Sequence, residues 1–215
     1  MTTEFKYDSS FSIEGECNPL IRKKMPYLEF TDGKGHDCYY GKQAVEIKYE
    51  AGYLYTGEKV TQPRFKAHME KEYYKKGLRE TTNIFIEIFS HMKYNTLGGV
   101  AQSYFKNPAE DFVIAHVFPY NDIMFIMNGK RLVKYLLENN NIANKELKLI
   151  KNQDKWTGGL ACGAEGLIKG TGGLKIDLNC GETKFHEALN TINGKVEFEK
   201  EKVIEYFKDN FKPKE

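Results

Sequence analysis

The sequence predicts an α/β protein. Segments in which apolar and polar residues alternate, as in strands, occur at several places between residues 38 and 127, and segments with helical spacing lie between and after them. At 215 residues the chain is long enough for one good-sized core. We expect that core over residues 1–140, and a less regular C-terminal extension over residues 141–215 that packs on the same domain.

Residues 38–49 are predicted to form a β-hairpin. Cys38–Tyr40 and Gln43–Tyr49 have strand-like composition, and the pair Gly41-Lys42 between them fits a tight turn. In the second strand, apolar residues alternate with Glu46, Lys48 and Glu50. Because side chains of a strand alternate between its faces, one face of this strand is apolar and the other is charged.

The other elements follow from periodicity and turn signals. We expect strands over Thr82–Phe89, Phe112–Phe118 and Ile123–Met127, followed by an amphipathic helix over Gly129–Glu138. Further helices are expected over Pro19–Met25, residues 64–79, Val100–Phe105 and Glu199–Phe211. Seven glycines between Gly158 and Gly173 predict loops or short strands there rather than a packed helix. The order of these glycines does not match a phosphate-binding loop, so a flexible loop is expected.

Composition sets limits on function. The net charge of +2, from 32 basic and 30 acidic residues, neither supports nor excludes a nucleic-acid partner. The four cysteines show no C-x-x-C pair, and the five histidines show no H-E-x-x-H arrangement, so neither a zinc knuckle nor a zinc hydrolase is supported. The first residues lack the apolar core of a signal peptide, and no apolar run is long enough to cross a bilayer. We expect a cytoplasmic protein with no membrane partner.

One group of residues carries chemistry. Glu46 and Lys48 are two apart on a strand, so their side chains leave the same face. Folding of the hairpin brings Asp37 close to Glu46. Two carboxylates beside an ammonium can hold Mg²⁺, which prefers oxygen ligands and is typically bound through one or two carboxylates plus substrate phosphate. The metal activates water and neutralises charge on phosphorus, and the lysine stabilises the attacking hydroxide or the phosphate.

These residues resemble the PD-(D/E)XK nuclease superfamily of restriction-endonuclease-like enzymes. The similarity rests on Asp37, on Glu46-Ile47-Lys48, on the strand that carries Glu87, on Gly98-Gly99 and on the strand that begins at residues 111–114; it spans roughly residues 28–137. The resemblance implies a mixed central sheet flanked by helices. It implies Asp37 and Glu46 as metal ligands, Lys48 as the catalytic lysine, and Glu87 as a further catalytic carboxylate near the metal. No proline precedes Asp37, residues 51–80 look like an insertion, and the glycine-rich C-terminal part has no counterpart.

The function expected from this resemblance is a Mg²⁺-dependent endonuclease that cleaves double-stranded DNA, with Mn²⁺ as a substitute metal. A type II restriction enzyme or a phage-type nuclease would fit, and a restriction enzyme would act as a homodimer. The alternatives are a non-catalytic nucleic-acid-binding protein with the same fold and a nuclease that acts on RNA.

A basic segment between the two acidic strands is the candidate DNA contact. Its main residues are Arg64, Lys66, Lys71, Lys75 and Lys76, and only Glu70 and Glu72 oppose them. Such a local excess suits contacts to phosphates. The alternative is a helix face that only meets solvent.

Structural alternatives exist for each site residue. Glu46 and Lys48 would also suit the solvated face of an edge strand. Asp32, which is more typical of an ordinary turn, competes with Asp37 as the metal ligand. Glu87 would also suit the solvent side of an amphipathic strand.

Overall fold

The structure is a computed structural model. It describes residues 18–31, 36–49, 53–54, 80–81, 83–91, 94, 96–99, 112–118, 122–139, 148–152, 155–193 and 205. The strands within these ranges form a six-stranded main sheet, a four-stranded second sheet and a two-stranded ribbon.

The main sheet is mixed. Its order is β1 (Glu29–Phe30), β2 (Cys38–Tyr40), β3 (Gln43–Tyr49), β8 (Phe112–Phe118), β9 (Ile123–Asn128) and β12 (Leu174–Asp177). β3 and β8 run parallel, whereas the other neighbours are antiparallel. The expected α/β class with a mixed sheet is therefore confirmed, and so is the β2–β3 hairpin.

The second sheet is antiparallel throughout. Its order is β10 (Lys148–Asn152), β11 (Lys155–Gly163), β6 (Asn83–His91) and β7 (Thr96–Leu97). The ribbon consists of β4 (Tyr53–Leu54) and β5 (Glu80–Thr81). The strand that carries Glu87 thus belongs to a different sheet from the strand that carries Glu46.

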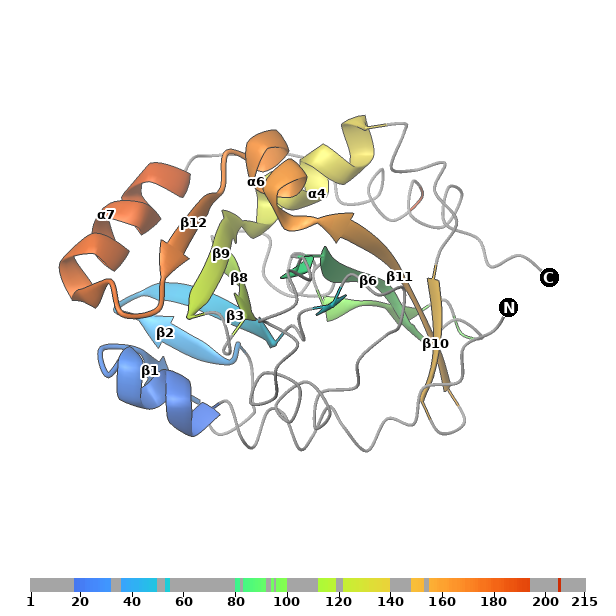
Figure 1. Ribbon diagram of the computed structural model, residues 1–215. Coiled ribbons are helices and arrows are strands. Elements are labelled where there is room, and N and C mark those ends of the chain that lie inside the picture. Colours follow the sequence, from blue (N-terminus) through green and yellow to red (C-terminus); the bar gives the residue numbers. More distant parts are fainter. Residues whose placement is uncertain are drawn as a thin grey trace.

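Helices and the second sheet cover the two faces of the main sheet (Figure 1). On one face, the helix of residues 18–24 and α7 (Gly181–Ile192) pack through Ile21 and Phe185 against Val45 and Ile47 of β3. On the other face lie α4 (Gly129–Glu138), α6 (Ala164–Thr171) and the isoleucines of β6, in one cluster with Ala44 of β3. Alternate residues of β3 therefore face different cores.

The prediction for the glycine-rich segment was wrong. Residues 158–173 complete the long strand β11, form helix α6 and reach β12. The glycines permit close packing rather than loose loops: a Cβ on Gly170 would lie 2.1 Å from the Tyr135 ring of α4, and one on Gly159 would lie 2.3 Å from Phe85 of β6. Composition alone does not distinguish glycines needed for close approach from glycines of a loop.

The observed bounds of the strands and helices can be compared with the predicted ones. The strand predicted to end at Phe89 extends to His91, and α4 has the predicted bounds, with its N-terminus capped by the side chain of Asn128. β11 and β12, which lie beyond residue 141, pair with β6 and β9 from before it. The helices predicted over residues 64–79 and Val100–Phe105 lie outside the described residues, as does nearly all of the one over Glu199–Phe211.

None of the helices that the structure describes has the length and apolar character needed to cross a membrane. Cys38, Cys162 and Cys180 carry no disulfide, and Cys17 lies outside the described ranges.

Candidate functional site

Glu46 and Lys48 form an ion pair on β3. The Lys48 Nζ donates to Glu46 Oε1 over 2.7 Å, and the side chain of Glu46 is only 13% exposed. β3 lies between β2 and β8, and is therefore not an edge strand. The alternative of a solvated edge strand is wrong, because both neighbouring positions are filled by other strands.

The pair points toward the second sheet. Ala44, on the same face of β3, packs in one cluster with Ile84 and Ile86 of β6. Because side chains alternate along a strand, Glu46 and Lys48 share the face of Ala44. The two charged groups thus lie partly buried beside apolar residues, where they need partners.

The hairpin brings Asp37 to this pair, as predicted. The register pairs Cys38 with Val45, which sets the preceding residue, Asp37, opposite Glu46. The amide of Ile47 donates to Asp37 Oδ2 over 2.7 Å. One oxygen of the Asp37 carboxylate is therefore fixed on the backbone of β3, between the two residues of the ion pair.

Glu87 approaches from the second sheet and is held by a glycine pair. The amide of Gly99 donates to Glu87 Oε1 over 3.3 Å, and the amide of Gly98 donates to the carbonyl of Ile88 over 2.7 Å. A Cβ on Gly98 would lie 2.4 Å from the Glu87 carbonyl oxygen. Only glycine allows this segment to lie so close to β6.

Gly99 connects Glu87 to the ion pair. A Cβ on Gly99 would lie 3.7 Å from Lys48 Nζ and 3.9 Å from Glu46 Oε1. The same glycine binds Glu87, so Glu87 and the ion pair flank one stretch of backbone. We refer to Asp37, Glu46, Lys48 and Glu87 as the acid–lysine cluster.

The electrostatics of the cluster agree with this geometry. Burial lowers the pKa of Lys48, but the charges of Glu46, Asp37 and Glu87 and the hydrogen bond to Glu46 outweigh it, so that the pKa lies above its ordinary value. Burial raises the pKa of Glu87, an effect that the Gly99 amide and Lys48 partly offset. Lys48 therefore stays charged at neutral pH, and Glu87 holds its proton more tightly than an exposed glutamate.

The side chain of Cys38, next to Asp37, is a protonated thiol at neutral pH and not a reactive thiolate. Burial raises its pKa to about 12, and the charges of Asp37 and Glu46 add to the effect. Because the thiolate is the reactive form, Cys38 is inert at neutral pH.

The donors of the cluster fit Mg²⁺ by chemical type. All three acidic side chains offer carboxylate oxygens, and Mg²⁺ needs only one or two of them from the protein. Within the described ranges, no group of three or more His, Cys, Asp and Glu side chains is arranged to hold a metal ion. The described cluster therefore offers oxygen donors of the type that Mg²⁺ prefers, without an assembled set of three ligands.

Two histidines beside the cluster, His36 and His116, were not predicted from the sequence as part of the site. His36 Nδ1 lies 3.4 Å from Glu46 Oε2. His116, which is 1% exposed, is the neighbour of Lys48 on the parallel strand β8. His36 could have been found from the sequence, because it precedes Asp37 at the start of the hairpin. His116 could not, because its place beside Lys48 depends on the pairing of β3 with β8.

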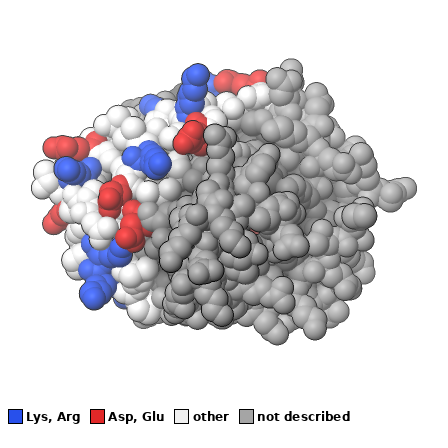
Figure 2. Space-filling model, viewed as in Figure 1, with Lys and Arg blue, Asp and Glu red and all other residues white. Residues whose placement is uncertain are grey.

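The candidate DNA-contacting residues lie outside the described residues. They are Arg64, Lys66, Lys71, Lys75 and Lys76, and the competing Asp32 also lies outside. On the described surface that Figure 2 shows, basic and acidic side chains are interspersed. That part of the surface therefore offers no uniformly basic area in this view.

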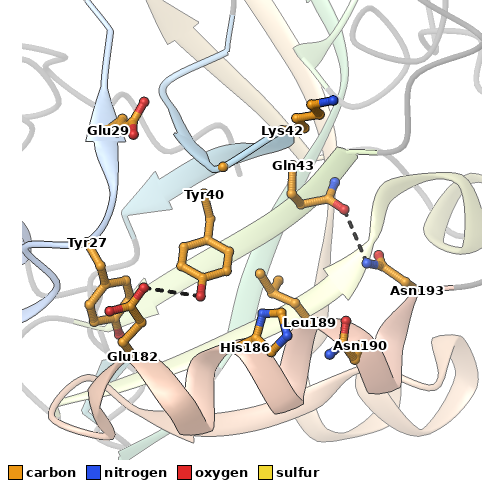
Figure 3. Close-up of a pocket in the computed structure, with 11 residues that line it drawn as sticks. Tyr27, Glu29, Tyr40, Lys42, Gln43, Glu182, His186, Leu189, Asn190 and Asn193 are labelled. Atoms are coloured by element: carbon orange, nitrogen blue, oxygen red, sulfur yellow. Dashed lines mark hydrogen bonds between the residues drawn. The ribbon is translucent and has the colours of Figure 1, made fainter.

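A hollow of about 720 Å³ lies apart from the cluster, between the β2–β3 turn and α7. It is lined by Tyr27, Glu29, Tyr40, Gly41, Lys42, Gln43, Glu182, His186, Leu189, Asn190 and Asn193. In Figure 3 the Tyr40 hydroxyl points to Glu182 and the Gln43 side chain to Asn193, and both pairs are hydrogen-bonded. None of the acid–lysine cluster lines this hollow.

No protein-family model, curated protein or solved structure matches the chain.

Proposed function

We propose that this protein is a Mg²⁺-dependent endonuclease that hydrolyses the phosphodiester bonds of DNA, with the acid–lysine cluster as its active site. The observation that carries the proposal is the convergence of the Glu46–Lys48 ion pair, Asp37 and Glu87 from two sheets. The helix of residues 18–24, followed by β1, β2, β3 and the parallel strand β8, is consistent with a restriction-endonuclease-like core.

The charge balance of the cluster favours a bound cation. Three carboxylates surround one ammonium, and Glu46 and Glu87 are both largely shielded from solvent. Buried carboxylates that exceed the nearby positive charge are costly unless a cation or a proton compensates them. Burial raises the pKa of Glu87 and so disfavours its charged form, which a nearby divalent ion would stabilise.

Each residue then has a role. Glu46 and Asp37 would hold the Mg²⁺, with Glu87 as a further carboxylate, and the ion would activate water and neutralise charge on the phosphate. Lys48 keeps its proton and stabilises the negative charge that develops at the phosphate. The Ile47 amide fixes the direction of the Asp37 carboxylate.

The proposal also includes a DNA-contacting segment and a homodimer. The basic residues of the 64–79 segment would bind DNA phosphates and so position the strand at the cluster. A homodimer would present two such sites, as cleavage of both strands at a two-fold symmetric sequence requires. Mn²⁺, which also accepts oxygen ligands, would replace Mg²⁺.

The test is incubation of supercoiled plasmid with the purified protein in Mg²⁺, in Mn²⁺ and in EDTA. The Lys48→Met variant, purified in the same way, controls for contaminating nucleases. We expect nicked or linear plasmid only with wild-type protein and metal. Binding of DNA without cleavage in either metal would overturn the nuclease proposal in favour of a binding protein. Cleavage of RNA alone, in a parallel digest, would overturn the choice of substrate.

A further inference from the structure

The Glu46 carboxylate has a different partner at each oxygen. Oε1 accepts from Lys48 Nζ over 2.7 Å, while Oε2 lies 3.4 Å from Nδ1 of His36. The side chains of His36 and Glu46 are 12% and 13% exposed, so little water competes for this contact. Each oxygen of the carboxylate thus faces a different basic side chain: Lys48 through a hydrogen bond, and His36 through a contact at ion-pair distance that lacks hydrogen-bond geometry.

The imidazole of His36 is itself held in place. It stacks on the ring of Phe112 in β8, with centroids 5.9 Å apart and 19° between the ring planes, and meets Tyr39 edge-on at 6.1 Å. The hydroxyl of Thr31 donates to the His36 carbonyl over 2.6 Å. Backbone and ring are both anchored, so the direction of Nδ1 is fixed by the fold.

We infer that His36 is a positioning residue of the site, which orients the Glu46 carboxylate through Oε2. A carboxylate has no hydrogen to donate, so it favours the imidazole form in which the nitrogen that faces it carries the hydrogen. Groups of this kind orient a metal-binding carboxylate without touching the metal. His36 acts through Glu46 rather than on DNA, and in this respect the inference rests on the proposed function.

Two substitutions distinguish the contribution of the His36 nitrogen from that of its aromatic ring. His36→Phe keeps a ring over Phe112 but removes the nitrogen, whereas His36→Asn places an amide nitrogen near the position of Nδ1 and removes the ring. His186→Ala, at an exposed position of α7, is the control for loss of a histidine elsewhere. Circular dichroism establishes that each variant is folded.

The readouts are metal binding by calorimetry without DNA, and kcat, KM for DNA and the Mg²⁺ requirement in cleavage. We expect His36→Phe to weaken metal binding and raise the Mg²⁺ requirement by roughly 10-fold or more, with KM for DNA unchanged. His36→Asn should recover most of the loss, and His186→Ala should match wild type. A wild-type metal requirement in His36→Phe, or an equal loss in His36→Asn, would overturn the inference.

A further measurement is independent of the proposed function. In metal-free wild-type protein, the ring-nitrogen NMR spectrum of His36 should show hydrogen on Nδ1, and Glu46→Ala should abolish that preference. If plasmid is not cleaved but this result holds, the nuclease proposal fails while the orientation of Glu46 by His36 stands. An identical spectrum in Glu46→Ala would overturn the role of His36 whatever the catalytic result.

Discussion

Lys48 and Glu46 pair across a single residue of β3, with 2.7 Å between Nζ and Oε1, on the face of the strand that the second sheet covers. Alternate residues of an exposed strand often carry opposite charges at little cost. Here the pair stands in a cluster with two more carboxylates and a backbone glycine, so either charge without the other would leave an uncompensated group. This dependence makes the pair directly testable.

We expect Lys48→Met to lower the cleavage rate by roughly 10²- to 10³-fold, because a donor aimed at developing charge is lost. Glu46→Gln should reduce cleavage to background, because a proposed metal ligand loses its charge. Lys42→Met, at the exposed hairpin turn, is the matched control and should be fully active. Rates are measured on plasmid under saturating Mg²⁺, and wild-type rates in either site variant would refute the assignment.

Asp37→Asn should abolish cleavage while the thermal midpoint changes little. The amide oxygen of Asn can still accept the hydrogen bond from Ile47, so the hairpin is retained and only the charge is lost. Asp32→Asn serves as the matched comparison and should remain active. The reverse pattern, an active Asp37→Asn with an inactive Asp32→Asn, would transfer the metal ligand to Asp32.

Glu87→Gln should raise the Mg²⁺ concentration for half-maximal cleavage, since a carboxylate near the metal is neutralised. The raised pKa of Glu87 adds a pH dependence. In wild-type protein the Mg²⁺ requirement should increase as pH falls through that pKa, in a window that begins above the ordinary glutamate value of about 4.3. The variant should lack this dependence; the same metal and pH response as wild type would place Glu87 outside the site.

The same pKa predicts the sign of a stability change. Because the folded protein binds the Glu87 proton more tightly than the unfolded chain, this group favours folding at low pH, and that contribution is lost as pH rises through the folded pKa. The thermal midpoint of Glu87→Gln relative to wild type should therefore increase with pH across the window. A difference that is independent of pH would mean that Glu87 titrates alike in both states.

Gly98→Ala and Gly99→Ala should differ in their effect on stability, although the glycines are adjacent. A Cβ on Gly98 would lie 2.4 Å from a backbone oxygen of β6, which forces the backbone to move, whereas one on Gly99 would make ordinary contacts at 3.7 Å and beyond. We expect Gly98→Ala to destabilise the protein by about 1–3 kcal/mol, and Gly99→Ala to have little effect. Denaturant unfolding measures both, and equal stabilities would contradict the close approach.

Replacement of Lys71, Lys75 and Lys76 by Ala should weaken DNA binding without changing the rate at saturating DNA. Each lost phosphate contact should reduce the slope of log affinity against log salt by about one unit. Binding is measured in Ca²⁺ over a range of salt concentrations. An unchanged slope in the triple variant would mean that this segment does not contact DNA.

The sequence was most informative for features formed by residues that are close together along the chain. The hairpin, its register and the approach of Asp37 to Glu46 are local, because alternation and a Gly41-Lys42 turn determine which side chains face each other. Helix α4 was equally accessible, with helical periodicity and a capping Asn128 at its start.

Long-range features were not accessible in this way. Nothing in the pattern around Glu87 indicates that its strand belongs to a second sheet, since strand order depends on pairings between distant segments. The role of Gly98 beside β6 and the place of His36 beside Glu46 likewise depend on which surfaces pack together. The helix α6 was missed because its glycines were interpreted by composition, whereas Gly170 is needed for contact with Tyr135.

The parallel pairing of β3 with β8 has a consequence for how the protein folds. Tyr49 and Phe112 are joined by a long stretch of chain, so their strands meet only after a large loss of loop entropy, whereas β2 and β3 close through a two-residue turn. Asp37, Glu46 and Lys48 therefore assemble early, on a local hairpin. Glu87, Gly99 and the Phe112 ring under His36 arrive only with the late contacts. We therefore expect the cluster to be complete only in the finished fold, since the β2–β3 hairpin by itself supplies Asp37, Glu46 and Lys48 but not Glu87.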